Sequence, residues 1–88
     1  MESYKLEFTH RASQVLEQIA HRDPELYRRF ANALDNLESN PFQGKPLKGE
    51  LKGRWSYRVG SYRIVYRIYR DKLVVIVIDI GHRREIYR

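Results

Sequence analysis

The chain has 88 residues, of which 42% are hydrophobic and 32% are charged, and it contains no cysteine. This length fits one domain with a single modest core, and this composition is typical of globular proteins and not of disordered ones. Without cysteine there are no disulfides or thiolate metal sites, which fits a reducing cytoplasm. No apolar run approaches the roughly 20 residues that span a bilayer, and the first residues lack a signal-peptide pattern. We therefore expect one soluble, cytoplasmic domain over residues 1–88, without membrane contact.

The net charge of +6 is unevenly distributed along the chain. Residues 1–44 carry five Lys/Arg and seven Asp/Glu, whereas residues 45–88 carry twelve Lys/Arg and four Asp/Glu. The basic half also holds six of the eleven aromatic residues. This combination indicates a polyanionic partner. Charge alone is equally compatible with a well-solvated surface.

The acidic half predicts a short strand followed by two helices. Residues 4–8 alternate between polar and apolar, as in a strand, and Thr9 is a helix N-cap. Apolar residues then recur at helical spacing up to Ile19, and residues 21–22 form a short connection. Asp23 and Pro24 are an N-cap and a first-turn proline, so they start a second helix, which Asn40-Pro41 ends. We expect these two amphipathic helices to form a hairpin that covers a sheet.

Residues 41–53 contain three glycines and two prolines. We expect an ordered loop, held in place by Phe42, Leu47 and Leu51, and not a linker between domains. Three strands follow: residues 55–59, a second that ends near residue 70, and residues 73–80. Apolar and basic residues alternate in the first two, which predicts one dry face and one wet face.

A two-residue turn at Gly60-Ser61 predicts the register of the first two strands. It pairs Val59 with Tyr62 and places Arg58 directly opposite Arg63 on the wet face. Like charges in such a pair are destabilising by tenths of a kcal/mol up to about 1 kcal/mol, and an anion between them would relieve the repulsion. Trp55, Tyr57 and Tyr66 are expected in the core.

The last strand is apolar on both faces, so its orientation depends on the preceding turn. A three-residue turn over residues 71–73 predicts that the dry face gains Val74, Ile76, Ile78 and Ile80. Gly81 then lies beside Arg63, and Arg83 falls on the wet face with His82 and Tyr87 close by. The resulting fold is α+β, with the order β-α-α-β-β-β and the helical hairpin on one face of a small, mainly antiparallel, twisted sheet.

The sequence resembles the RelE/ParE superfamily of toxins over essentially its whole length. The residues that carry the resemblance are Pro46-Leu47-Lys48-Gly49, residues 53–58 (GRWSYR), residues 62–66 (YRIVY) and residues 81–87 (GHRREIY). The resemblance implies the toxin of a type II toxin–antitoxin system. RelE-like members cut mRNA in the decoding site of the ribosome, and a small RelB-like antitoxin silences them.

The resemblance also implies roles for individual residues. Arg63 matches an arginine that contacts phosphate near the cut, and Arg83 matches one that stabilises the transition state. Tyr87 resembles a tyrosine that stacks on a base and orients the reacting hydroxyl. His82 lies where several members place a histidine near the reaction, and Arg58 lies where some have a basic residue.

The sequence departs from the family pattern at Ser56, where RelE has a second lysine. The spacing between Arg83 and Tyr87 is also shorter than in RelE. Both departures concern residues near the expected reaction centre.

The chemistry assigns complementary tasks to these side chains. Arginine binds phosphate well but does not transfer protons at neutral pH, so Arg58, Arg63 and Arg83 are expected to act as electrostatic clamps. Histidine titrates near neutral pH, which favours His82 over Tyr87 for proton transfer. Further basic residues are expected to attract the substrate: Lys48, Lys52, Arg54 and Arg67. No cofactor and no metal are expected, because the three histidines are far apart and cysteine is absent.

Two other functions are compatible with the same sequence. ParE-like members share the fold but poison DNA gyrase, and they generally lack the arginine–arginine–tyrosine set formed here by Arg63, Arg83 and Tyr87. A nucleic-acid-binding member without activity is the third possibility, because Ser56 replaces a family lysine.

Overall fold

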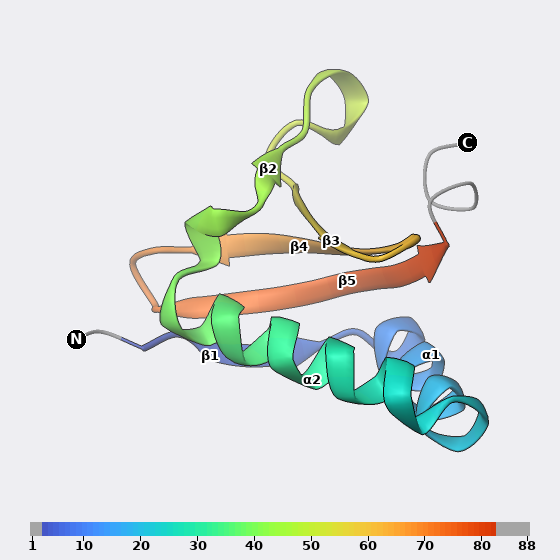
Figure 1. Ribbon diagram of the computed structural model, residues 1–88. Helices are drawn as coiled ribbons and strands as arrows, with labels where there is room; N and C mark the ends of the chain where they lie inside the picture. The colour runs from blue at the N-terminus through green and yellow to red at the C-terminus, as the bar shows by residue number, and fades with distance from the viewer. Residues whose placement is uncertain (1–2, 83–88) are drawn as a thin grey trace.

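The computed structural model describes residues 3–82, in which two helices cover one face of a five-stranded sheet (Figure 1). The elements are β1 (Lys5–Phe8), α1 (His10–Arg22), α2 (Pro24–Ser39), β2 (Lys45–Pro46), β3 (Trp55–Val59), β4 (Tyr62–Tyr69) and β5 (Val74–His82). The strand order is β1-β5-β4-β3-β2; β1 runs parallel to β5, and the other neighbours are antiparallel. The predicted α+β fold is confirmed, with β2 added to the expected strands.

Each helix begins where the sequence predicts a cap. The Thr9 side chain accepts a hydrogen bond from Ala12 N at 3.2 Å and donates one to Ile78 O at 2.6 Å, so it caps α1 and fastens it to β5. Asp23 accepts from Leu26 N at 3.0 Å and caps α2, with Pro24 in the first turn. In residues 3–82, neither helix is long and apolar enough to cross a membrane.

The connection between the helices is shorter than predicted. We expected residues 21–22 to join them, but α1 continues through Arg22. Asp23 alone separates the helices: its backbone N–H donates to Ile19 O at the end of α1, while its side chain caps α2. One residue therefore serves both helix termini, which fixes the hairpin tightly.

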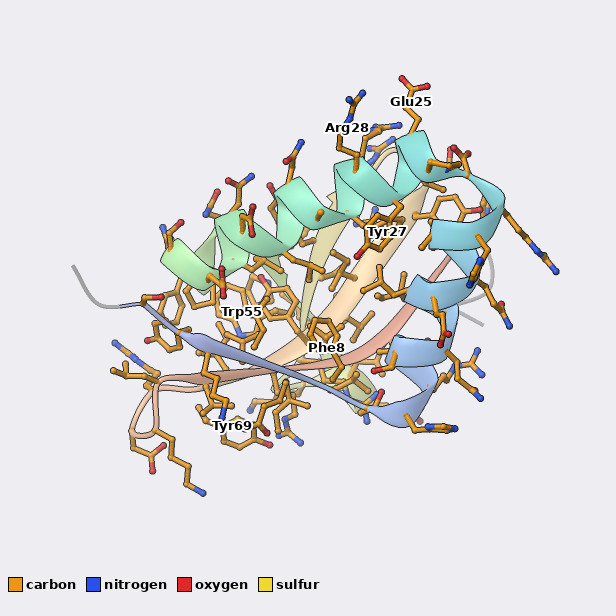
Figure 2. All side chains as sticks on the ribbon, turned by 90° about the horizontal axis from the view of Figure 1, so that it is seen from below. Phe8, Glu25, Tyr27, Arg28, Trp55 and Tyr69 are labelled. Atoms are coloured by element: carbon orange, nitrogen blue, oxygen red, sulfur yellow. The ribbon has the colours of Figure 1, made fainter. Side chains whose placement is uncertain are left out.

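The core lies between the helices and the sheet. Phe30 and Leu37 of α2 are fully buried, as are Ile64 and Tyr66 of β4. The ring of Phe30 meets that of Tyr62 edge to face, with centroids 5.7 Å apart. Figure 2 looks at this layer from the helix side. Burying each large side chain contributes about 1.5–3 kcal/mol, so this layer stabilises the sheet that carries the arginines.

The predicted orientation of β5 is wrong for most of the strand. Val75 and Val77 are fully buried, and they take the core positions that we expected for Val74, Ile76 and Ile78. The turn is one residue longer than predicted, because Tyr69 pairs with Val74, and this reverses the alternation.

A β-bulge then restores the predicted pattern further along β5. Tyr66 pairs with Val77 but Val65 pairs with Asp79, so Ile78 is the extra residue. Beyond the bulge Ile80 is buried, and Gly81 lies beside Arg63 as predicted.

Tyr66 anchors the loop that follows α2. Its hydroxyl donates to the Pro41 carbonyl at 2.7 Å, and a methyl group added at Gly44 would overlap that hydroxyl. Burial raises the pKa of Tyr66 to about 12, although the backbone hydrogen bond at Gly44 lowers it. The loop is thus ordered, as predicted, but a buried tyrosine holds it together with Phe42, whose ring contacts Trp55.

Removing the hydroxyl of Tyr66 should destabilise the protein. We expect Tyr66→Phe to lower the free energy of unfolding by about 1–3 kcal/mol, because the buried Pro41 carbonyl loses its donor. The pKa of about 12 in the folded protein exceeds the ordinary value of 10.0. Wild-type stability should therefore hold below pH 10 and fall as pH rises toward 12, and the variant should lack this fall. Urea unfolding at several pH values measures both effects. Tyr27→Phe, at an exposed site on α2, is the control; equal midpoints for the two variants would contradict the anchoring role.

Candidate nucleic-acid interface

Arg58 and Arg63 lie directly opposite each other on β3 and β4, as predicted. Gly60 has a φ of 60°, which a two-residue hairpin turn that begins with glycine favours. Val59 and Ile64, the next residues on each strand, are buried under the helices. Because successive side chains alternate across a strand, both arginines lie on the face that the helices leave uncovered.

The two arginines are held by different partners. Arg58 is exposed, and its Nε donates to the Gly60 carbonyl at 3.0 Å. Arg63 is half-buried, and its Nη1 lies 3.4 Å from Ser56 Oγ, which is only 3% exposed. Ser56 therefore supports Arg63 at the position where the resemblance to RelE implies a lysine. This role of Ser56 was not predicted, although the alternation of side chains along the strand places Ser56 on the same face as Arg58.

The other basic residues predicted to bind substrate lie on β4 and on the loop that precedes β3. Arg67 follows Arg63 on the same face of β4, and a methyl group at Gly53 would lie 3.0 Å from its Nη2. Lys52 and Arg54 flank Gly53 in the chain, and Lys48 is exposed in the same loop. Figure 1 shows this loop extending from the sheet on the side away from α2. Arg67 thus shares the uncovered face of β4 with Arg63, and the loop that carries Lys48, Lys52 and Arg54 approaches Arg67 at Gly53.

His82 is not brought together with the arginines. It pairs with Tyr62 at the end of β5, and the two rings meet edge to face with centroids 5.6 Å apart. Tyr62 packs on Phe30, so His82 lies on the helix side of the sheet, where it lines a cleft of about 490 Å³ beside α1. Among residues 3–82, no group of three His, Asp or Glu side chains could hold a metal ion.

Arg83 and Tyr87 lie outside the described residues, so their predicted positions stay predictions. The described part of the strand ends at His82, directly after Gly81, which neighbours Arg63. Of the three arginines expected to act as clamps, the structure therefore describes Arg58 and Arg63.

A groove beside Arg58 was not predicted. It measures about 350 Å³, lies along β3, and is lined by Lys45, Ser56 and Arg58 among others. Lys45 reaches it because β2 pairs Lys45 with Ser56. A strand of two residues has no periodicity, so the sequence held no signal for this contact.

Comparison with known proteins identifies the family. Residues 6–87 match the model described as "ParE toxin of type II toxin-antitoxin system, parDE". The chain belongs to this family. The resemblance to RelE/ParE toxins is thereby confirmed for nearly the whole sequence.

Individual relatives of this ParE-family toxin carry toxin names. Toxin RelG of Mycobacterium tuberculosis is 36% identical over 86 residues, which cover 97% of each chain. The toxin–antitoxin complex RelBE2 from the same species matches with a TM-score of 0.82 and 32% identity, covering 94% of both chains. A YoeB/ParE toxin from Agrobacterium tumefaciens matches with a TM-score of 0.80 and 28% identity, covering 89% of this chain and 96% of that one.

The position of His82 predicts a small effect of its replacement on the RNA cleavage that the family resemblance implies. We expect His82→Gln to leave the cleavage rate within about tenfold of wild type, because the ring faces away from Arg63. The same variant should lower the free energy of unfolding by about 0.5–1.5 kcal/mol, because the contact with the Tyr62 ring is lost. Cleavage assays over a range of pH, together with urea unfolding, test both parts. A rate loss of about 10²–10⁴, with an altered pH dependence, would instead assign proton transfer to His82.

Proposed function

We propose that this toxin is an endoribonuclease that cleaves mRNA in the decoding site of the ribosome and so inhibits translation. The observation that carries the proposal is the opposition of Arg58 and Arg63 on the uncovered face of the sheet. Two guanidinium groups in this position suit one phosphodiester, because each offers a planar fork of donors to phosphate oxygens. The basic second half of the chain would attract such a substrate.

The proposed chemistry is attack by the RNA's own 2′-hydroxyl on the adjacent phosphate. This reaction needs in-line geometry, a proton acceptor, stabilisation of the charge that develops on phosphorus, and a donor for the leaving oxygen. Arg58 and Arg63 would supply the charge stabilisation. The family resemblance adds Arg83 to this task and assigns Tyr87 to stacking on a base and orienting the hydroxyl.

Proton transfer is assigned by the same reasoning to a residue near the end of the chain. Arginine does not accept a proton at neutral pH, so the clamps are unsuited to it. His82 was the favoured candidate from sequence, but its ring packs against Tyr62 on the helix side. We therefore place Tyr87 first for this role and His82 second.

Replacing a clamp arginine should abolish most of the cleavage. We expect Arg63→Ala to lower the cleavage rate by about 10²–10³-fold, comparable to the loss of an oxyanion donor. Primer extension on mRNA from translating ribosomes measures the cuts, and Arg83→Ala should have a similar effect. Lys72→Ala, which removes a charge from the exposed β4–β5 turn, is the control. Equal cleavage by Arg63→Ala and Lys72→Ala would refute the clamp.

The family description favours one alternative function, which the primer-extension experiment also tests. The matching family bears the name ParE, and the resemblance to ParE-like members implies poisoning of DNA gyrase. Intact mRNA in cells arrested by the wild-type toxin, with gyrase trapped on DNA, would favour that function. Cuts that follow the reading frame favour the nuclease.

We also propose that a small RelB-like antitoxin binds this toxin. The RelBE2 structure similar to it is a toxin–antitoxin complex, and an acidic amphipathic segment would complement a basic surface. The expected result is that expression arrests growth, and that co-expression of the neighbouring small gene restores growth and yields a complex on purification. Purification of the toxin alone, in high yield from normally growing cells, would contradict this expectation.

A further inference from the structure

A second groove continues from the arginine pair around the edge of β3 to helix α2. It measures about 270 Å³, and Tyr57 and Arg58 line both this groove and the one beside Lys45. The two grooves meet because β2 covers β3 only at Trp55 and Ser56, so β3 lacks a neighbouring strand beyond that point. Tyr57 and Arg58 therefore link the groove beside the proposed reaction centre to the one that reaches α2.

Two arginines from different elements converge in this second groove. A methyl group added at Gly60 would lie 3.1 Å from Nη2 and 3.2 Å from Nη1 of Arg29, so the guanidinium of Arg29 lies over the β3–β4 turn. Arg58 Nε donates to the carbonyl of the same glycine at 3.0 Å. Arg29 and Arg58 thus approach one residue from α2 and from β3.

The groove contains no acidic group to offset this charge. Its lining and that of the adjoining groove include no Asp or Glu among residues 3–82. The remaining polar groups are amides and a phenol: Asn32, Asn36 and Tyr57, with Asn36 Nδ2 lying 3.4 Å from Tyr57 Oη. Positive charge beside amide groups suits an RNA backbone with an adjacent base. The phosphate pairs with the arginines, and the amides form hydrogen bonds with the edge of the base.

We infer that the groove formed by Arg29, Asn32, Asn36 and Arg58 binds a backbone phosphate of the RNA substrate, next to the phosphate held by Arg58 and Arg63. Arg29 is then a substrate-binding residue on α2, outside every basic stretch that the sequence singles out. The inference rests on the proposed function, because it extends the same RNA strand from the reaction centre. Neutralisation of two converging guanidiniums by one phosphate supplies the binding energy.

The test measures binding to RNA that cannot be cleaved. We expect Arg29→Ala to weaken binding of a fully 2′-O-methylated single strand of about eight nucleotides by roughly tenfold, as for one charge-assisted hydrogen bond. The slope of log K against log salt should fall by about 0.7, which corresponds to one phosphate contact on a single strand. Arg29→Lys should keep the slope, because it keeps the charge.

Arg28→Ala is the matched control. Arg28 precedes Arg29 on α2, carries the same charge, is exposed, and points away from the molecule in Figure 2. An equal change of slope for Arg28→Ala and Arg29→Ala would overturn the inference, because the effect would then come from net charge. A normal slope for Arg29→Ala, together with lost binding of the antitoxin, would also overturn it and make the groove a protein-binding site.

Two further measurements separate the possible outcomes. If Arg29→Ala weakens binding only to ribosomes that carry no mRNA, the phosphate belongs to ribosomal RNA, and the assignment to the substrate strand is wrong. If the wild type cuts no mRNA on ribosomes but Arg29→Ala still weakens oligonucleotide binding, the proposed nuclease function fails while the groove stands.

Discussion

The register of the β3–β4 hairpin is the constraint on which the functional surface depends. The turn at Gly60-Ser61 sets that register, and its glycine adopts a backbone conformation that other residues disfavour. A shift of β3 by one residue against β4 would turn Arg58 into the helix-covered core and away from Arg63. The same glycine also lies beneath Arg29 and accepts the hydrogen bond from Arg58. One turn therefore sets the pairing of the facing arginines and also contacts the Arg29 side chain of α2.

The sequence was sufficient where local chemistry decides the structure. Thr9, Asp23 and Pro24 mark helix starts through their own side chains, and the hairpin register follows from a two-residue turn. It was insufficient for β5, whose residues are apolar on both faces. There the orientation depended on the length of a turn in which Leu73 takes a φ of 54°, a conformation that its side chain gives no reason to expect.

The residues of the candidate site likewise differ in whether local sequence patterns could predict their positions. Arg58, Arg63 and Arg67 could be placed on one face by alternation within strands, and Gly81 could be placed beside Arg63. His82 was misplaced because it was grouped with Arg63 through its nearness to Gly81, whereas alternation along β5 turns its side chain to the helix-covered face with Tyr62. Arg29 and Lys45 were not predicted as site residues at all. Each reaches β3 through packing between elements that are distant in the chain, and such contacts leave no periodic signal.

The parallel pairing of β1 with β5 has a consequence for synthesis of the chain. β5 lies between β1 and β4, so β1 has no strand to pair with until the last described strand is made. Both helices and the β3–β4 hairpin can form earlier, since their contacts are with nearby segments. During translation, the nascent polypeptide would thus carry an incomplete sheet with an unsatisfied edge. The arginine surface would gain its full support only after β5 has been synthesised.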